Sequence, residues 1–358
     1  MSCIYFVCPD LKTAAGGIKQ IYRQVDVLNE VGYKAYVLHE SPFFKCTWFH
    51  NNTKIVHSKK VFSEIKQQHK NYRKNSLRKI LSHFIVETKM FLKNVGTKKS
   101  NALSLKRDDI FVFPEIYAFA STKVFPYNKK VIYNQNCYYT FSNLSLDLDC
   151  KTQFSYTEEN TLATIVASQD AIDYLKYTFP GINLYRVHYG IDNNLFKYQL
   201  IKEKKIAFMP RKLGEDVIQV INIIKQREIL NNWEFVEIDN MKENEVAEVL
   251  KQSAIFLSFN HREGFGMPPA EAMACGCVVI GYTGYGGKEY FKESFSYPIP
   301  DRDVQTFAKT LEQILREYDF DSKPFVEKGK KASEFILSEY TLEREKNDIV
   351  NVWNKILN

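Results

Sequence analysis

Residues 255–280 read IFLSFNHREGFGMPPAEAMACGCVVI, and this stretch predicts a parallel α/β fold. The apolar run 255–259 predicts a buried strand that ends near Asn260. A loop with two glycines follows, where backbone can approach a ligand closely, and a Pro-Pro pair then predicts the first turn of a helix. The apolar residues 278–280 predict the next buried strand. Strand, loop, helix and strand in this order form a βαβ unit.

Two acidic residues flank the glycine loop of this unit. Glu263 lies in the loop, and Glu271 is expected in the first turn of the helix. Glycines and a helix N-terminus that follow a strand make an anion site, so a phosphate is the expected ligand there. Carboxylates on either side of a phosphate are suited to accept hydrogen bonds from sugar hydroxyls. The pattern therefore predicts a nucleotide sugar, which carries a sugar on each side of a diphosphate.

The alternation of strands and helices extends over the rest of the chain. Residues 4–7 predict a strand, Gly16 and Gly17 end the following loop, and an apolar pattern with helical spacing continues to Gly32. Further strands are predicted at 34–38, 110–113, 131–134, 164–167, 184–188, 206–209 and 234–238, and further helices at 170–179, 217–230, 243–252 and 342–357. We interpret the charged run 195–205 as a linker between two such series.

Bulk properties limit the class of protein and its location. The chain has 358 residues, which suits two domains, and no run of 18 apolar residues that could span a membrane. Residues 1–8 lack a positively charged leader, and the seven cysteines include no Cys-x-x-Cys pair. We therefore expect a reduced, cytoplasmic protein without structural zinc.

The motif from Glu263 to Val279 resembles that of the retaining GT-B glycosyltransferases, a family whose signature is Glu, seven residues, Glu. Similarity also covers Gly16-Gly17, the stretch 189–196 and the glycines of 284–287. The resemblance implies an α/β GT-B fold, in which two Rossmann-like, doubly wound domains face each other across a cleft.

The resemblance also implies a division of the chain. Residues 1–195 would form an N-terminal Rossmann-like acceptor domain, which contains a basic insertion at 54–107. Residues 196–340 would form the C-terminal nucleotide-sugar donor domain. Residues 341–358 would form a helix that returns to the N-terminal domain.

In this family the motif acids contact the donor. By resemblance, Glu271 would bind the ribose hydroxyls of the donor nucleotide, and Glu263 would contact hydroxyls of the transferred sugar. The backbone amides between them would lie against the sugar and the diphosphate; these residues are Gly264, Phe265 and Gly266.

Basic and glycine residues complete the implied donor site. Arg211 matches the family arginine that neutralises the diphosphate and stabilises charge on the leaving nucleotide. The family usually has a lysine a few residues further along; here either Lys212 takes that role or the lysine is missing. Gly16 and Gly17 would let the N-terminal domain close on the phosphates.

The acceptor side departs from the family pattern. Many members carry a histidine near the reacting sugar, whereas this chain has Glu115, Gln135 and Asn136 after two predicted strands. The implied mechanism is front-side transfer with retention, in which the leaving phosphate helps to take the acceptor proton. It requires no side-chain nucleophile, metal or other cofactor. The acids Asp147 and Asp149 are typical of a metal site in another glycosyltransferase fold, but no strand pattern precedes them.

A basic segment suggests an anionic partner. Residues 54–107 hold 15 Lys and Arg against two acids, a balance of +13, so the rest of the chain carries 7 − 13 = −6. A helix predicted at 77–95 has an apolar stripe between basic residues. This stripe either packs on the N-terminal domain or enters the surface of an anionic membrane.

Three functional hypotheses follow. The first is sugar transfer from a nucleotide sugar to a lipid-linked or cell-surface polysaccharide acceptor, in the cytoplasm or at the inner face of the membrane. In the second, the basic segment holds nucleic acid and the enzyme glycosylates its bases. In the third, a GT-B protein binds nucleotide sugar or glycan without turnover.

Overall fold

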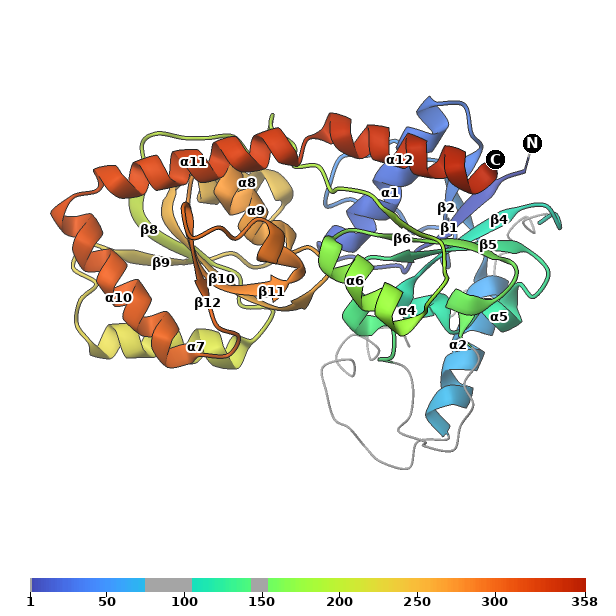
Figure 1. Cartoon of the computed structure of the whole chain (residues 1–358), viewed down its shortest axis with the longest axis horizontal. Helices are drawn as coiled ribbons and strands as arrows, with labels where there is room; N and C mark the ends of the chain where they lie inside the picture. Colours follow the sequence, from blue (N-terminus) through green and yellow to red (C-terminus); the bar gives the residue numbers. More distant parts are fainter. Residues whose placement is uncertain (1, 75–104, 143–153) are drawn as a thin grey trace.

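The computed structural model describes residues 2–74, 105–142 and 154–358. They form two lobes that lie side by side, each built around a sheet, and the C-terminal helix lies on the lobe that contains the N-terminus (Figure 1). The predicted amphipathic helix at 77–95 and the acid pair Asp147 and Asp149 lie outside the described residues.

The first lobe contains a parallel sheet of seven strands in the order β3-β2-β1-β4-β5-β6-β7. Its strands are β1 Ile4–Val7, β2 Ala35–His39, β3 Ile55–His57, β4 Ile110–Pro114, β5 Lys129–Asn134, β6 Thr161–Val166 and β7 Leu184–Arg186. Its helices are α1 Gly16–Glu30, α2 Lys59–Lys74, α4 Glu115–Ala118, α5 Ser121–Val124 and α6 Gln169–Thr178.

The second lobe contains a parallel sheet of five strands in the order β12-β11-β10-β8-β9. Its strands are β8 Glu203–Phe208, β9 Glu234–Glu237, β10 Ser253–Glu263, β11 Val278–Tyr285 and β12 Ser296–Ile299. Its helices are α7 Gly214–Gln226, α8 Glu243–Gln252, α9 Met267–Ala274, α10 Val304–Phe320 and α11 Lys323–Glu339.

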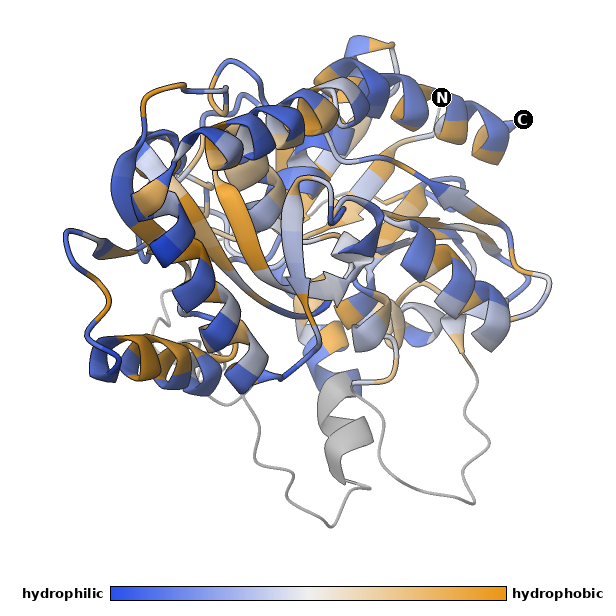
Figure 2. Ribbon diagram, turned by 60° about the vertical axis from the view of Figure 1, so that its left-hand side comes forward, coloured by the Kyte–Doolittle hydropathy of each residue, from blue (hydrophilic) through white to orange (hydrophobic). Residues whose placement is uncertain are grey.

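Both sheets have the doubly wound arrangement that the sequence predicts. Strand order reverses between β1 and β4 in the first sheet and between β8 and β10 in the second. The strands are coloured mainly as hydrophobic and the outer helix faces as hydrophilic (Figure 2), which fits sheets covered by helices. In such sheets ligands bind beyond the carboxyl ends of the strands where the order reverses. The carboxyl ends of β1, β8 and β10 are therefore the places to look for a site.

The last helix, α12 (Leu342–Leu357), joins the C-terminal end of the chain to the first lobe. The fully buried ring of Trp353 lies 5.8 Å from the ring of Phe6 on β1, and its indole nitrogen donates to Gln24 Oε1 on α1 at 3.2 Å. Arg23 on α1 forms an ion pair with Glu345 on α12. The apolar stripe of the predicted helix 342–357 thus packs on the N-terminal lobe.

Two details of the central motif differ from the prediction. Strand β10 does not end near Asn260 but continues to Glu263, which pairs with Tyr285 of β11 after a register shift. Glu271 was expected in the first helical turn, but α9 begins at Met267, so Glu271 lies in the second turn. The helix begins there because Gly266, at φ +87°, turns the chain in the left-handed conformation that glycine favours.

We predict that Trp353→Ala lowers the free energy of unfolding by about 3–5 kcal/mol, because it empties a fully buried site between α12 and β1. Urea unfolding monitored by circular dichroism measures this loss. Asn351→Ala, at an exposed position of the same helix, is the matched control and should unfold like the wild type. Equal stability of the two variants would show that α12 does not depend on this contact.

Candidate active site

The two lobes meet where β10 and β5 end. A Cβ atom on Gly264 would lie 1.8 Å from the carbonyl oxygen of Gln135, so no larger residue fits without moving a backbone. Beside it, Asn136 Nδ2 donates to the carbonyl of Arg262 at 2.7 Å. The structure thus brings together the glycine loop of the donor motif and the polar residues predicted on the acceptor side.

The start of α1 lies at the same place. A Cβ on Gly17 would lie 2.4 Å from Gln135 Oε1, and a Cβ on Gly16 would lie 3.6 Å from Met267 Cγ at the start of α9. The N-termini of α1 and α9 therefore converge from opposite lobes. Each carries the positive end of a helix dipole, so together they favour an anion, although Pro268 and Pro269 leave the start of α9 with fewer backbone N–H groups than the start of α1.

The carboxylate of Glu115 holds the backbone of Gln135 in place. Its Oε2 accepts a hydrogen bond from the Gln135 backbone N–H at 3.0 Å, and only 8% of its surface is exposed. Burial raises the pKa of Glu115 to about 7. Glu115 was predicted on the acceptor or sugar side together with Gln135, and its carboxylate holds the Gln135 backbone.

Arg211 and Lys212 follow β8 and take different directions. Arg211 Nη1 donates to the carbonyl of Ala14 at 2.8 Å, across the boundary between the lobes and just before α1. Lys212 forms an ion pair with Glu263. Burial, with a smaller contribution from the Arg211 guanidinium, lowers the pKa of Lys212 to about 7. Whether Lys212 takes the role of the family lysine stays a prediction; its ammonium lies on a motif acid.

Glu271 lies in a different electrostatic environment from Glu263. Burial raises the pKa of Glu271 to about 7, while Lys19 on α1 lowers it and Glu243 on α8 raises it further. Near neutral pH a substantial fraction of Glu271 is therefore protonated, whereas a solvated glutamate is almost fully ionised. Each motif acid is influenced by a lysine: Lys212 forms an ion pair with Glu263, and the charge of Lys19 lowers the pKa of Glu271.

The glycine loop is held by a tyrosine that the sequence analysis missed. The fully buried Tyr290 hydroxyl donates to the backbone carbonyls of Phe265, at 3.1 Å, and Gly266. A Cβ on Gly286 would lie 2.3 Å from the carbonyl oxygen of Gly264, so the glycine run 284–287 packs directly on the motif. That run was the only signal of this support in the sequence, and it does not identify the tyrosine.

A second polar bridge joins the lobes next to this loop. Glu289 forms an ion pair with Arg186 at the end of β7, and its Oε2 accepts from the Gln169 backbone N–H at 3.2 Å. Tyr340, before α12, donates to Glu289 Oε1 at 3.0 Å. These residues cannot be identified from local sequence, because the partners are far apart along the chain.

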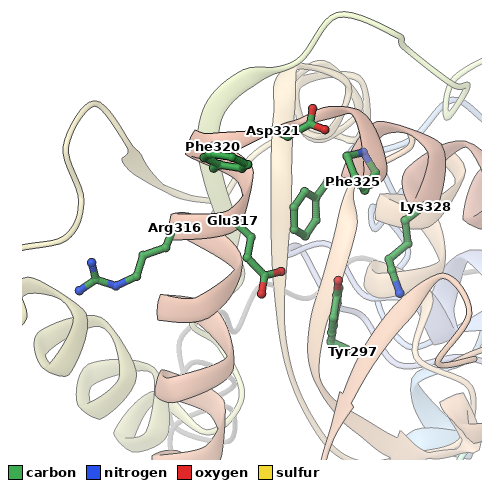
Figure 3. A pocket seen from close by; sticks show the side chains of 8 residues that line it. Tyr297, Arg316, Glu317, Phe320, Asp321, Phe325 and Lys328 are labelled. Carbon is green, nitrogen blue, oxygen red and sulfur yellow. The ribbon is translucent and has the colours of Figure 1, made fainter.

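Other features lie apart from this site. Among residues 2–74, 105–142 and 154–358, no group of three metal-binding side chains is arranged to hold an ion, and no helix is long and apolar enough to cross a bilayer. Figure 3 shows a pocket at the junction of α10, α11 and β12, lined by Tyr297, Phe320, Phe325 and Lys328 among others. None of its lining residues belongs to the predicted donor site.

The fold is that of the GT-B glycosyltransferases. Residues 188–332 match the family model described as glycosyl transferases group 1. This match covers the donor motif, and the chain is a glycosyltransferase of the hexosyltransferase type. The predicted fold class, two Rossmann-like domains of the GT-B kind, is confirmed.

Relatives in sequence and structure agree with this class. An α-1,6-glucosyltransferase of Actinobacillus pleuropneumoniae serotype 7 (strain AP76) is 28% identical over 246 residues, 63% of this chain and 70% of that protein. A mutant of S. aureus TarM, in complex with fondaparinux, α-GlcNAc-glycerol and UDP, matches over the full length of both chains with a TM-score of 0.63 and 12% identity. The pneumococcal O-GlcNAc transferase GtfA, in complex with UDP and GlcNAc, matches 100% of this chain and 99% of that chain with a TM-score of 0.66 and 9% identity.

We predict that Gly264→Ala abolishes turnover of a donor sugar while the protein stays folded, because the added methyl group separates β10 from Gln135. Activity assays together with thermal melting check this. Gly214→Ala is the matched control, since nothing lies within 4 Å of a Cβ at this first residue of α7. Wild-type turnover in Gly264→Ala would contradict the close contact between the lobes.

Proposed function

We propose that this enzyme transfers a hexose from a nucleotide sugar to a lipid-linked or cell-surface polysaccharide acceptor, with retention of anomeric configuration. The observation that carries the proposal is the convergence of two helix N-termini, from α1 and α9, beside the Lys212–Glu263 ion pair. Helix ends and a lysine suit a diphosphate, and a carboxylate suits the hydroxyls of the attached sugar.

The relatives support a particular donor. Structures of TarM and GtfA contain UDP, and the sequence relative is named as a glucosyltransferase that forms an α-linkage. A UDP-hexose is therefore the first donor to test. An α-linked product from an α-linked donor requires retention, which agrees with the Glu-x7-Glu motif of Glu263 and Glu271.

In the proposed reaction, the bond between the sugar C1 and the diphosphate oxygen breaks, and a bond from C1 to an acceptor hydroxyl oxygen forms on the same face. The acceptor proton passes to the departing phosphate, so no protein nucleophile is used. Arg211 and Lys212 stabilise the negative charge on the leaving nucleotide diphosphate, which is electrostatic stabilisation of the transition state. Glu263 and the amides of Gly264, Phe265 and Gly266 hold the sugar, without a metal.

Gln135 and Asn136 are the proposed contacts on the acceptor side. They lie against the donor motif from the N-terminal lobe, through the Gly264 contact and the hydrogen bond to Arg262. Glu115 fixes the Gln135 backbone and so acts as a positioning residue. A hydroxyl that approaches the sugar from this lobe would meet these amides first.

We predict that a UDP-hexose raises the melting temperature of the wild type, since a ligand that binds only the native state stabilises it. Glu271→Ala should abolish the shift because the ribose hydroxyls lose their acceptor. Glu263→Gln should keep most of the shift and lose turnover, because this acid contacts the transferred sugar. The readouts are a thermal-shift screen of UDP-, GDP- and dTDP-sugars and a transfer assay. Wild-type affinity and turnover in both variants would refute the donor site.

We further propose that the basic segment 54–107 holds the enzyme against anionic lipid at the inner face of the membrane. In its described part, Lys59 and Lys60 are exposed at the start of α2, which projects from the first lobe (Figure 1). We predict sedimentation with vesicles that contain phosphatidylglycerol, reversed by salt, and no sedimentation with neutral vesicles. Salt-sensitive binding to duplex DNA without vesicle binding would favour nucleic acid as the partner instead.

A further inference from the structure

Lys19 connects the first lobe to the donor side of the second. It lies two residues after Gly17, in the first turn of α1, and forms an ion pair with Glu243, the first residue of α8. The side chains of Lys19 and Glu243 are 23% and 21% exposed, so the pair is partly shielded from solvent. At such a site a charge acts on its neighbours more strongly than on an open surface.

The same lysine acts on Glu271. Lys19 and Glu243 are the two charged groups that shift the Glu271 pKa, in opposite directions. The other titratable groups close by are Cys275, one turn further along α9, and Tyr290, and burial raises the pKa of both far above neutral pH. Neither is charged at neutral pH. The ionisation of Glu271 is therefore decided by burial, one cation from the opposite lobe and one anion from its own.

We propose that Lys19 is a positioning residue for the donor: from the N-terminal lobe it keeps the Glu271 carboxylate ionised against Glu243, so that ribose binding depends on contact between the lobes. This inference rests on the proposed role of Glu271 as the ribose acceptor. It differs from the roles of Arg211 and Lys212, which concern the diphosphate. Lys19 acts on the nucleotide through Glu271.

The ionisation state matters because of the hydrogen bonds that a ribose needs. An ionised carboxylate accepts from both ribose hydroxyls, whereas a protonated one has lost acceptor capacity and carries a donor. If the lobes separate, Lys19 leaves and Glu271 faces only Glu243. Binding of the nucleotide and contact between the lobes are then coupled, and by linkage each favours the other.

The test measures the dissociation constant of UDP-glucose by isothermal titration calorimetry between about pH 5.5 and pH 9. UDP-glucose is suitable because its diphosphate is esterified at both ends and does not titrate in this range. In the wild type, the part of the affinity that depends on Glu271 should be full above its pKa and fall as the pH drops through about 7. Lys212, whose pKa is also about 7, loses its charge as the pH rises and weakens binding in every variant, so each profile is compared with that of the wild type. In Glu271→Gln, which cannot ionise, the fall toward low pH should disappear.

Lys19→Gln and Glu243→Gln should move the profile in opposite directions. Without the cation, the Glu271 pKa rises, so Lys19→Gln should bind about threefold to tenfold more weakly at pH 7 and recover near pH 9. Without the competing anion, Glu243→Gln should bind more tightly than the wild type below pH 7. Lys19→Arg should restore the wild-type profile. Lys346→Gln breaks another ion pair of α1, that between Lys346 and Glu30, and serves as the control with an unchanged profile.

Three outcomes would overturn the inference. If Lys19→Gln and Glu243→Gln weaken binding equally at every pH, the Lys19–Glu243 ion pair only holds the two lobes together and does not act on Glu271. If Lys19→Gln weakens binding by the same factor up to pH 9, the lysine contacts the diphosphate directly. A Lys19→Gln profile that equals the wild type shows that Lys19 has no influence. Absence of nucleotide-sugar binding in the wild type, by contrast, refutes the proposed function itself.

Discussion

The site depends on a contact between two backbones, that of the loop after β10 and that of the residues after β5. Gly264 lies so close to Gln135 that a methyl group on it would overlap the Gln135 carbonyl. Backbone contacts have no side-chain torsions to adjust, so they fix how far apart the lobes can be when they meet. The start of α1 is positioned by the same Gln135, through Gly17. One steric constraint thus positions three parts of the proposed site. These are the glycine loop after β10, the amides of Gln135 and Asn136, and the N-terminus of α1.

Around this contact, polar pairs join the two lobes. Lys19 pairs with Glu243, Arg186 with Glu289, and Asn136 donates to the Arg262 carbonyl. Interfaces between domains of one chain generally resemble transient protein–protein interfaces, which are more polar than obligate ones. Polar partners can return to water at moderate cost, so such lobes can separate and rejoin. Aromatic contacts also cross the interface, between Tyr138 and Tyr285 and between Tyr189 and Phe265. Helix α12 adds a further apolar connection, since Trp353 is buried against β1 and α1.

The local sequence was sufficient to predict the central motif, because strand, glycine loop, proline-started helix and strand follow one another within 255–280. The bounds of α12 were also predicted correctly, since its apolar stripe has clear helical spacing. Glu271 was placed one turn too early, because α9 begins at Met267, directly after the left-handed Gly266 and before the Pro-Pro pair that was expected to start it. Lys19 and Tyr290 could not be found in this way, as their partners are distant in sequence or are backbone atoms.

The ion pair between Lys212 and Glu263 resolves an apparent conflict in the proposed site, where an acid lies close to the expected position of a diphosphate. A diphosphate bound at Arg211 would compete with Glu263 for the Lys212 ammonium, and it carries more negative charge than one carboxylate. Burial lowers the Lys212 pKa to about 7, and a phosphate next to the ammonium would raise this pKa and hold the lysine in its charged form. Transfer of the lysine from acid to phosphate frees the Glu263 carboxylate for the sugar hydroxyls. When the donor binds, Lys212 would therefore leave Glu263 for the diphosphate. This single change would free the Glu263 carboxylate for the sugar and neutralise charge on the leaving group.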